Sequence, residues 1–116
     1  MLFEGGEKSS MPNPKQDAAD VAAEMKANAK IASTMLKAIA NESRLLILCN
    51  LEGKELSVTA LNEQLDLSQS ALSQHLAVLR KDGLVKTRRE SQTIYYSLSD
   101  VRASKVIKTL HELYCS

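Results

Sequence analysis

The sequence predicts a mainly α-helical domain with one small β-hairpin, arranged as a winged helix-turn-helix. Two short amphipathic helices follow one another with only a short turn between them, and a strand-like hairpin comes directly after the second. A helix with an apolar stripe stands toward each end of the chain. With 116 residues, 44% of them hydrophobic, the sequence is long enough for one modest core and one domain.

Residues 1–16 predict a disordered tail, because they combine Gly, Ser and Pro with little apolar content. The domain is therefore expected to span residues 17–116. Asp17 is a suitable N-cap for a first helix, in which apolar side chains recur at steps of three and four as far as Ile39. No stretch has the pattern of a signal peptide or a membrane span, so we expect a cytoplasmic protein with no membrane partner.

Good capping residues mark the next three helices. Asn41 precedes a helix whose apolar side chains surround it almost completely, which predicts a buried central element that Gly53 ends. Ser57 caps a short third helix, and Ser68 caps a fourth that Gly83 closes. Because only a short turn joins the third and fourth helices, they must cross sharply, as in a helix-turn-helix.

A hairpin and a last helix complete the predicted domain. Residues 84–90 and 93–98 are strand-like runs separated by the polar tip Ser91-Gln92, which predicts a wing. Ser99 or Asp100 is then expected to cap a helix with one apolar stripe.

The fourth helix has two faces of different chemistry. At about 100° per residue, Leu72, Leu76 and Leu79 form the buried face. Short hydroxyl and amide side chains suit the edges of base pairs, whereas an ordinary solvated surface favours Ala, Glu, Lys and Arg. His75 lies at the boundary of the two faces, where it can either pack against the core or contact DNA. The face opposite the leucines and its edges carry Gln69, Ser70, Ser73, Gln74, Ala77 and Lys81.

Charge is polarised along the chain, although the formal net charge is only +1. Residues 42–66 carry two basic and five acidic side chains, whereas residues 67–98 carry five basic and two acidic ones. Near the hairpin tip, Arg88, Arg89 and Gln92 can reach phosphates or a minor groove, although they could also form an ordinary solvated face. We therefore predict binding to double-stranded DNA. The candidate contact residues are Ser68, Gln69, Ser70, Ser73, Gln74, His75, Lys81, Arg88, Arg89 and Gln92.

The segments LKAIANESRLLILCNL (residues 36–51) and LSQSALSQHLAVLRKDGLV (residues 67–85) resemble the ArsR family of dimeric winged-helix transcription regulators. The resemblance implies that the fourth helix reads the major groove of a palindromic operator and that the terminal helices form a homodimer. Both terminal helices do carry more apolar surface than one small core requires. Ser91 stands where many members have glycine, so we expect a less sharp wing turn. The implied dimer residues are Met25, Met35, Val106, Leu110, Leu113 and Tyr114.

Metal sensing, cofactor chemistry and catalysis are not expected. Metal-sensing members of the family begin the third helix with Cys-x-Cys, but this chain has Ser57 and Thr59 there, and hydroxyls are poor ligands for soft metals. On the last helix only His111 and Glu112 could bind a metal, and adjacent helix positions diverge. The chain has two histidines and no glycine-rich phosphate loop, which leaves no catalytic set to propose.

The two cysteines, Cys49 and Cys115, allow two interpretations. Cys49 shares an apolar face of the second helix and can act as a small hydrophobic residue, whereas Cys115 lies off the stripe of the last helix. This arrangement resembles the thiol-based branch of the family, which includes HlyU-type activators of toxin genes and regulators that respond to persulfides. We expect a redox switch between the two thiols. The alternatives are a metal-independent repressor with inert cysteines and a winged-helix module that binds protein.

Overall fold

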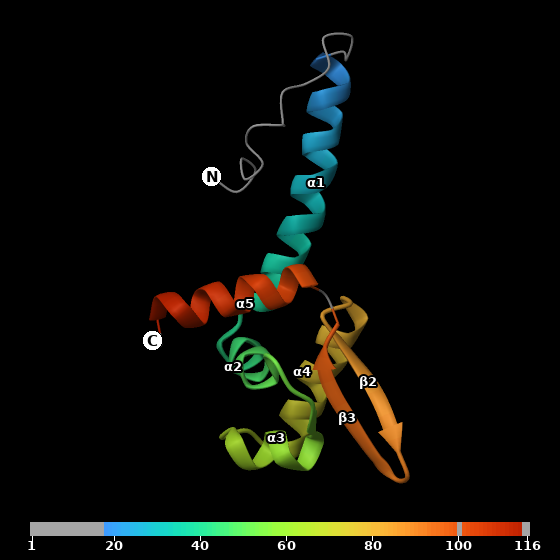
Figure 1. The fold of residues 1–116 in the computed structure, drawn as a ribbon, viewed down its shortest axis with the longest axis vertical. Helices are drawn as coiled ribbons and strands as arrows, with labels where there is room; N and C mark the ends of the chain where they lie inside the picture. The colour runs from blue at the N-terminus through green and yellow to red at the C-terminus, as the bar shows by residue number, and fades with distance from the viewer. Residues whose placement is uncertain (1–17, 100, 115–116) are drawn as a thin grey trace. The chain divides into compact units, whose positions relative to one another are not determined.

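The computed structural model describes residues 18–99 and 101–114 of the chain (Figure 1). The predicted tail of residues 1–16, the predicted caps Asp17 and Asp100, and Cys115 lie outside the described residues. The chain divides into two units, with the boundary after Ser33, and each unit is described by itself.

Helix α1 (Ala18–Ile39) is the long first helix that the apolar spacing predicts. In the unit that ends at Ser33, its apolar side chains are largely exposed, including Met25 and Ile31. In the second unit its last two residues, Ala38 and Ile39, are buried in the core. The helix therefore presents more apolar surface than the core of the second unit uses.

Three shorter helices begin at the predicted caps. The side-chain oxygens of Asn41, Ser57 and Ser68 each accept a hydrogen bond from the backbone N–H three residues later, at 3.0, 3.1 and 3.1 Å respectively. These bonds satisfy backbone donors that have no partner inside the helix. The three helices are α2 (Glu42–Leu51), α3 (Val58–Gln64) and α4 (Gln69–Lys81).

Gly83 ends α4, as predicted. Its φ of +78° lies in the left-handed region, where glycine carries no steric penalty. The N–H of Gly83 donates to the Arg80 carbonyl at 3.1 Å, and the N–H of Leu84 donates to the Leu79 carbonyl at 2.9 Å. These two bonds form a Schellman motif, which turns the chain from α4 directly into the wing.

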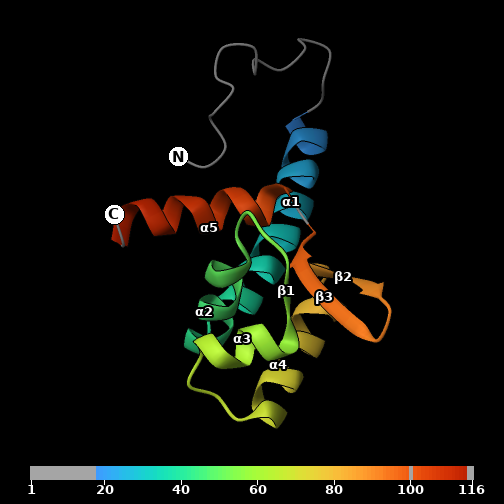
Figure 2. The same cartoon turned by 60° about the horizontal axis from the view of Figure 1, so that its bottom comes forward.

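The wing belongs to a three-stranded antiparallel sheet in the order β1-β3-β2 (Figure 2). Both strands of the predicted hairpin are present, and β1 is an addition to it. Sequence patterning missed β1 because two residues are too few to establish an alternation, and their partners, Tyr95 and Tyr96, lie far along the chain. The strands are β1 (Leu56–Ser57), β2 (Val85–Glu90) and β3 (Thr93–Leu98).

The wing turn contains only Ser91 and Gln92, between the paired residues Glu90 and Thr93. The expectation of a less sharp turn is therefore wrong. Ser91 forms the tight turn by adopting a φ of +56°, a conformation that glycine enters at lower cost.

Helix α5 (Val101–Tyr114) follows the wing. Ser99, one of its two predicted caps, uses its hydroxyl elsewhere and donates to the Gly83 carbonyl at 2.6 Å. This bond joins the end of β3 to the end of α4. Within residues 18–99 and 101–114, no helix combines the length and the apolar character needed to cross a bilayer.

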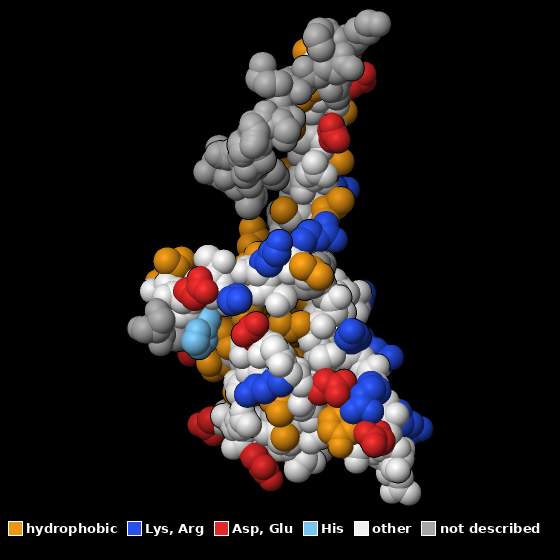
Figure 3. Space-filling model, viewed as in Figure 1, with side chains coloured by type: hydrophobic (Ala, Val, Ile, Leu, Met, Phe, Trp, Pro, Cys, Tyr) orange, Lys and Arg blue, Asp and Glu red, His pale blue; other side chains and the backbone are white. Residues whose placement is uncertain are grey.

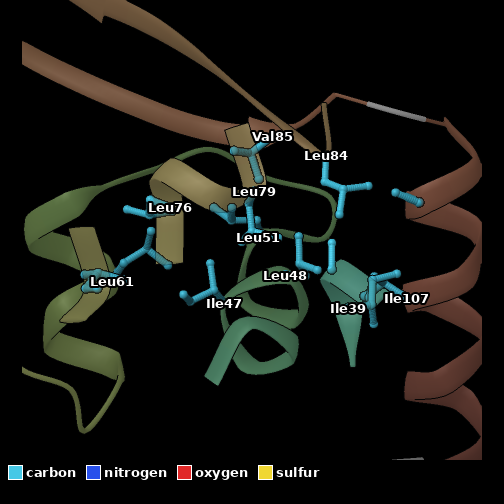
Figure 4. Close-up of a cluster of buried hydrophobic side chains, with 13 residues drawn as sticks. Ile39, Ile47, Leu48, Leu51, Leu61, Leu76, Leu79, Leu84, Val85 and Ile107 are labelled. Atoms are coloured by element: carbon cyan, nitrogen blue, oxygen red, sulfur yellow. The ribbon is translucent and has the colours of Figure 1, made fainter. Parts of the chain in front are cut away.

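The core of the second unit gathers one side of every helix around α2 (Figure 4). The predicted buried central element is α2, of which Ile47, Leu48 and Leu51 are buried, although Leu46 is 48% exposed. The helices that follow α2 cover Ile47, Leu48 and Leu51, and they leave the Leu46 side open within the described chain. The buried cluster that contains these α2 residues also includes Leu61, Leu72, Leu76, Leu79, Leu84, Val85 and Ile107.

Candidate nucleic-acid interface

The orientation of α4 follows from its apolar spacing. Leu72, Leu76 and Leu79 are at most 1% exposed, so the predicted leucine face points into the core. Burying three leucines stabilises this orientation by several kcal/mol, at roughly 1.5–3 kcal/mol per side chain. The opposite face must then point away from the core.

That opposite face is open along the length of α4. In the first turn, the hydroxyl oxygens of Ser68 and Ser70 lie 3.5 Å apart, so the cap and the outward face are in contact. The uncharged positions come first and a lysine comes in the last turn, as the sequence predicts. The exposed residues of this face are Ser68, Gln69, Ser70, Ser73, Gln74, Ala77 and Lys81.

His75 is half-buried beside Leu76, at the boundary that the helical wheel predicts. The position is compatible both with packing and with a DNA contact. Its role as a contact residue stays a prediction.

The two faces of the wing differ because strand side chains alternate. Arg88 lies on the outer face, where Nε and Nη2 donate to the carboxylate of Glu55 at 3.0 and 2.9 Å. Nη1 donates to Glu90 at 3.0 Å, and the guanidinium carbon lies 4.9 Å from the ring centre of Tyr95. Figure 3 shows basic and acidic side chains next to one another over the wing.

This cluster changes the titration of its members. The hydrogen bond from Arg88 lowers the pKa of Glu55 below its ordinary value of 4.5, so the carboxylate stays charged in more acidic solution. The hydrogen bonds to Glu55 and Glu90 raise the pKa of Arg88. Two carboxylates therefore surround one of the two predicted wing arginines.

Arg89 lies on the other face of the wing, the face that also carries buried Val85 and half-buried Tyr96. Among the described residues it has no carboxylate partner. Gln92 is exposed at the tip. The structure thus leaves Arg89 and Gln92 open toward solvent, and it holds Arg88 in an ion pair.

Sequence reasoning missed the partners of Arg88. Glu55 is 33 residues away in sequence, and the unpredicted strand β1 brings it to the wing. The alternation of side chains along the predicted strand could have shown that Arg88 and Arg89 lie on opposite faces of the wing.

Ser57 and Thr59 stand where metal-sensing members of the family have Cys-x-Cys, and neither is a cysteine. The Ser57 hydroxyl caps α3, and Thr59 is exposed. In the part of the chain that the structure describes, no three His, Cys, Asp or Glu side chains gather closely enough to hold a metal ion.

Cys49 is half-buried on α2 and packs against the core. Its predicted partner, Cys115, lies outside the described residues. Of the residues implied in a dimer, Met25, Leu113 and Tyr114 are exposed. The other three, Met35, Val106 and Leu110, are half-buried.

Comparison with known proteins agrees with this geometry. Residues 41–87 match the family model described as bacterial regulatory protein, arsR family. The chain is 58% identical over 92 residues to the transcriptional activator HlyU of Vibrio cholerae serotype O1, which covers 79% of this chain and 85% of HlyU. It is 51% identical to the nodulation protein NolR of Rhizobium meliloti, over 75% of this chain and 71% of NolR.

Solved structures give the same result. Reduced HlyU from Vibrio cholerae matches with a TM-score of 0.78 and 57% identity, over 80% of this chain and 98% of that one. HlyU from Vibrio vulnificus matches with a TM-score of 0.77 and 56% identity, over 81% and 98%. These relatives are regulators of transcription rather than enzymes. The chain therefore belongs to the arsR family of bacterial regulatory proteins, which are DNA-binding regulators of transcription.

Proposed function

We propose that two copies of this chain form a homodimer that reads a palindromic operator through the exposed face of α4. The observation that carries this proposal is the composition of that face. Its first turns present only hydroxyl, amide and methyl groups, although they are exposed. Gln69 and Gln74 can form paired hydrogen bonds with adenine, and Ser70 and Ser73 can donate or accept at either base.

Exposed apolar side chains on the last helix support the dimer. Leu113 and Tyr114 are 68% and 80% exposed, at the end of α5. Neighbouring exposed apolar side chains are typical of an interaction surface, and a second copy would cover them isologously. A twofold dimer presents its two recognition helices to half-sites about 34 Å apart, which is one turn of DNA.

Footprinting on promoter fragments tests this proposal. The expected result is two protected major-groove segments whose centres lie about one helical turn apart. Affinity should also fall by about 10³–10⁵-fold between about 50 and 200 mM salt, as expected if the dimer contacts 6–10 phosphates. If no DNA segment is protected, or if the affinity does not depend on salt concentration, the result would instead favour a module that binds protein.

We further propose that the bound dimer activates toxin or virulence genes by displacing a silencing protein. The relative at 58% identity is named as an activator, whereas a relative at 39% identity is named as a repressor. A reporter gene behind the footprinted promoter should be more active with the regulator only when a silencing protein is also present. Lower activity with the regulator would make it a repressor.

A thiol switch is proposed to control this binding. Cys49 lies on α2, which packs against α4 and α5, so a bond from Cys49 to Cys115 would link the helix beneath the recognition helix to the dimer helix. Forming the disulfide removes two protons and two electrons from the thiols, and hydrogen peroxide takes them up as water. Persulfidation by sulfane sulfur is the second chemistry proposed for these thiols. We expect this switch to act in the cytoplasm, where thiols are normally reduced.

Mass spectrometry of the native protein, before and after peroxide, tests the switch. The expected product is two mass units lighter per chain and binds the operator more weakly. Cys49→Ser and Cys115→Ser variants should bind like the reduced protein and should not respond to peroxide. If peroxide still weakened operator binding in both variants, the two cysteines would not form the switch.

A further inference from the structure

A hollow of about 500 Å³ lies between α4 and strand β3. One wall is a single stripe of α4, since its other residues lie three, four, seven and eight positions after Ser73. The other wall is the wing residue Tyr96. The lining residues are Ser73, Leu76, Ala77, Arg80, Lys81 and Tyr96.

Side-chain size explains why this hollow is open. Ser73 begins the α4 wall and Ala77 lies one turn further along it, and the short side chains of both leave space beside the helix. Leu76 is 1% exposed and belongs to the core, so it forms an apolar floor that holds the position of the wall. The long side chains of Arg80 and Lys81 stand only at the C-terminal end.

The register of the wing adds a third cation nearby. Tyr96 pairs with Thr87 across the hairpin, and Arg89 is two residues further along β2. Residues two apart on a strand share a face, and diagonal neighbours lie about 7–8 Å apart. Arg89 therefore stands on the same wing face as Tyr96, next along the sheet toward the tip.

The charge of this site is positive and uncompensated. Among the described residues, Arg80, Lys81 and Arg89 have no carboxylate partner, and no acidic side chain lines the hollow. The hollow on the other side of the wing base differs, because Glu55 lines it together with Lys54 and Lys86. Of these two hollows beside the wing, the one on the α4 side has basic residues and no carboxylate in its lining.

We propose that this hollow is a phosphodiester-binding site, which holds one backbone phosphate of the DNA strand that passes between α4 and the wing. The proposal rests on the DNA-binding function proposed above. The Arg80 guanidinium donates to the phosphate oxygens as a planar fork, and the Tyr96 hydroxyl donates from the opposite wall. Lys81 adds positive charge in the lining, and Arg89 adds it on the same wing face, two residues nearer the tip than the partner of Tyr96. Such a contact fixes the register of α4 on the duplex without reading bases.

The test replaces single operator phosphates, one at a time, by neutral methylphosphonates. Wild-type protein should lose affinity at one symmetric pair of positions. Arg80→Gln should bind natural operator and random DNA about tenfold more weakly, as for one charged hydrogen bond, and its slope of log K against log salt should fall by about 0.9 per chain. On the substituted operator, Arg80→Gln should lose no further affinity at that same pair of positions.

Two further variants complete the experiment. Lys86→Gln removes one charge from the outer face of the same wing and should retain the full methylphosphonate effect. Tyr96→Phe removes one hydroxyl without changing charge, and it should weaken binding while leaving the salt slope unchanged. If wild type and Arg80→Gln lose equal affinity at every position, the inference is wrong although the protein still binds DNA. If the wild-type protein protects no DNA, the proposed function itself fails.

Discussion

Two neighbouring arginines lie on opposite faces of the wing, and they differ in whether a carboxylate pairs with them. On the outer face, Arg88 is surrounded by Glu55, Glu90 and the ring of Tyr95. On the face that carries Tyr96, Arg89 has no carboxylate partner among the described residues. Adjacent residues on a strand thus meet different surroundings, and their charges are not equally available to a polyanion.

This difference gives the two faces of the wing different roles, one in holding the fold together and one in the proposed DNA contact. The Arg88 cluster ties β2 across β3 to the residue that precedes β1, and β1 leads directly into α3. It therefore holds the wing to the helix-turn-helix. Under the proposal above, the other face contacts DNA. Both arginines were predicted to contact DNA, and the following experiments test whether only one of them does so.

The largest effect is expected in the core, at a leucine that also lines the α4 hollow. Leu76→Ala should lower the free energy of unfolding by about 2–5 kcal/mol, because Leu76 is 1% exposed and its loss leaves a cavity. Leu46→Ala is the matched control, since Leu46 is 48% exposed and should cost less than about 1 kcal/mol. Urea unfolding of both variants measures the difference. If both variants lost the same free energy of unfolding, the core would not hold α4 as described.

The next effect separates the two arginines directly. Arg89→Gln should weaken binding to all DNA sequences about tenfold and reduce the salt slope by about 0.9 per chain, as for the loss of one phosphate contact. Arg88→Gln should keep the wild-type salt slope, since its charge is balanced by two carboxylates. Titrations at several salt concentrations provide both values. Equal slopes for the two variants would contradict the division of the wing.

A smaller effect is expected at the tip that the two faces share. Ser91→Gly should raise the free energy of unfolding by about 1 kcal/mol, because Ser91 has a φ of +56° and glycine enters this region at lower cost. Thermal or urea unfolding would detect the gain. Lower stability in the glycine variant would mean that the Ser91 side chain makes a contact worth more than its backbone strain.

The smallest effect is expected from the outer cluster itself. Hydrogen bonding to Arg88 lowers the pKa of Glu55 in the folded protein. Its stabilisation is therefore complete above the unfolded value near 4.5 and is lost as the pH falls through the lowered folded value. Glu55→Gln should have a lower Tm than wild type at neutral pH, and the two Tm values should converge as the pH falls through the lowered pKa of Glu55. A gap in Tm that does not depend on pH would exclude the ion pair as its cause.

Local signals in the sequence were sufficient for much of the fold. Asn41, Ser57 and Ser68 cap helices because their side chains bond to a backbone only three residues away, and Gly83 ends a helix through its own φ. Residues that depend on distant partners could not be placed in this way. The Glu55 to Arg88 pair is an example, because an unpredicted strand brings the two together.

The sequence also overstated one pattern and missed one site. Apolar residues almost all round α2 predicted a buried central element, but neighbouring elements cover only part of the helix and Leu46 remains exposed. Arg80 and Tyr96 were not predicted as contact residues, because only the packing of β3 beside α4 brings them to one hollow. The candidate face of α4 could be predicted, since its leucines alone determine which side points outward.

The central claim is that the exposed, uncharged face of α4 reads bases. The most direct measurement compares the affinity of Gln74→Ala for the footprinted operator and for random DNA at the same salt concentration. The account predicts that this variant loses about 1–3 kcal/mol on the operator and almost nothing on random DNA. Equal losses on both would contradict the claim, because Gln74 would then act without regard to sequence.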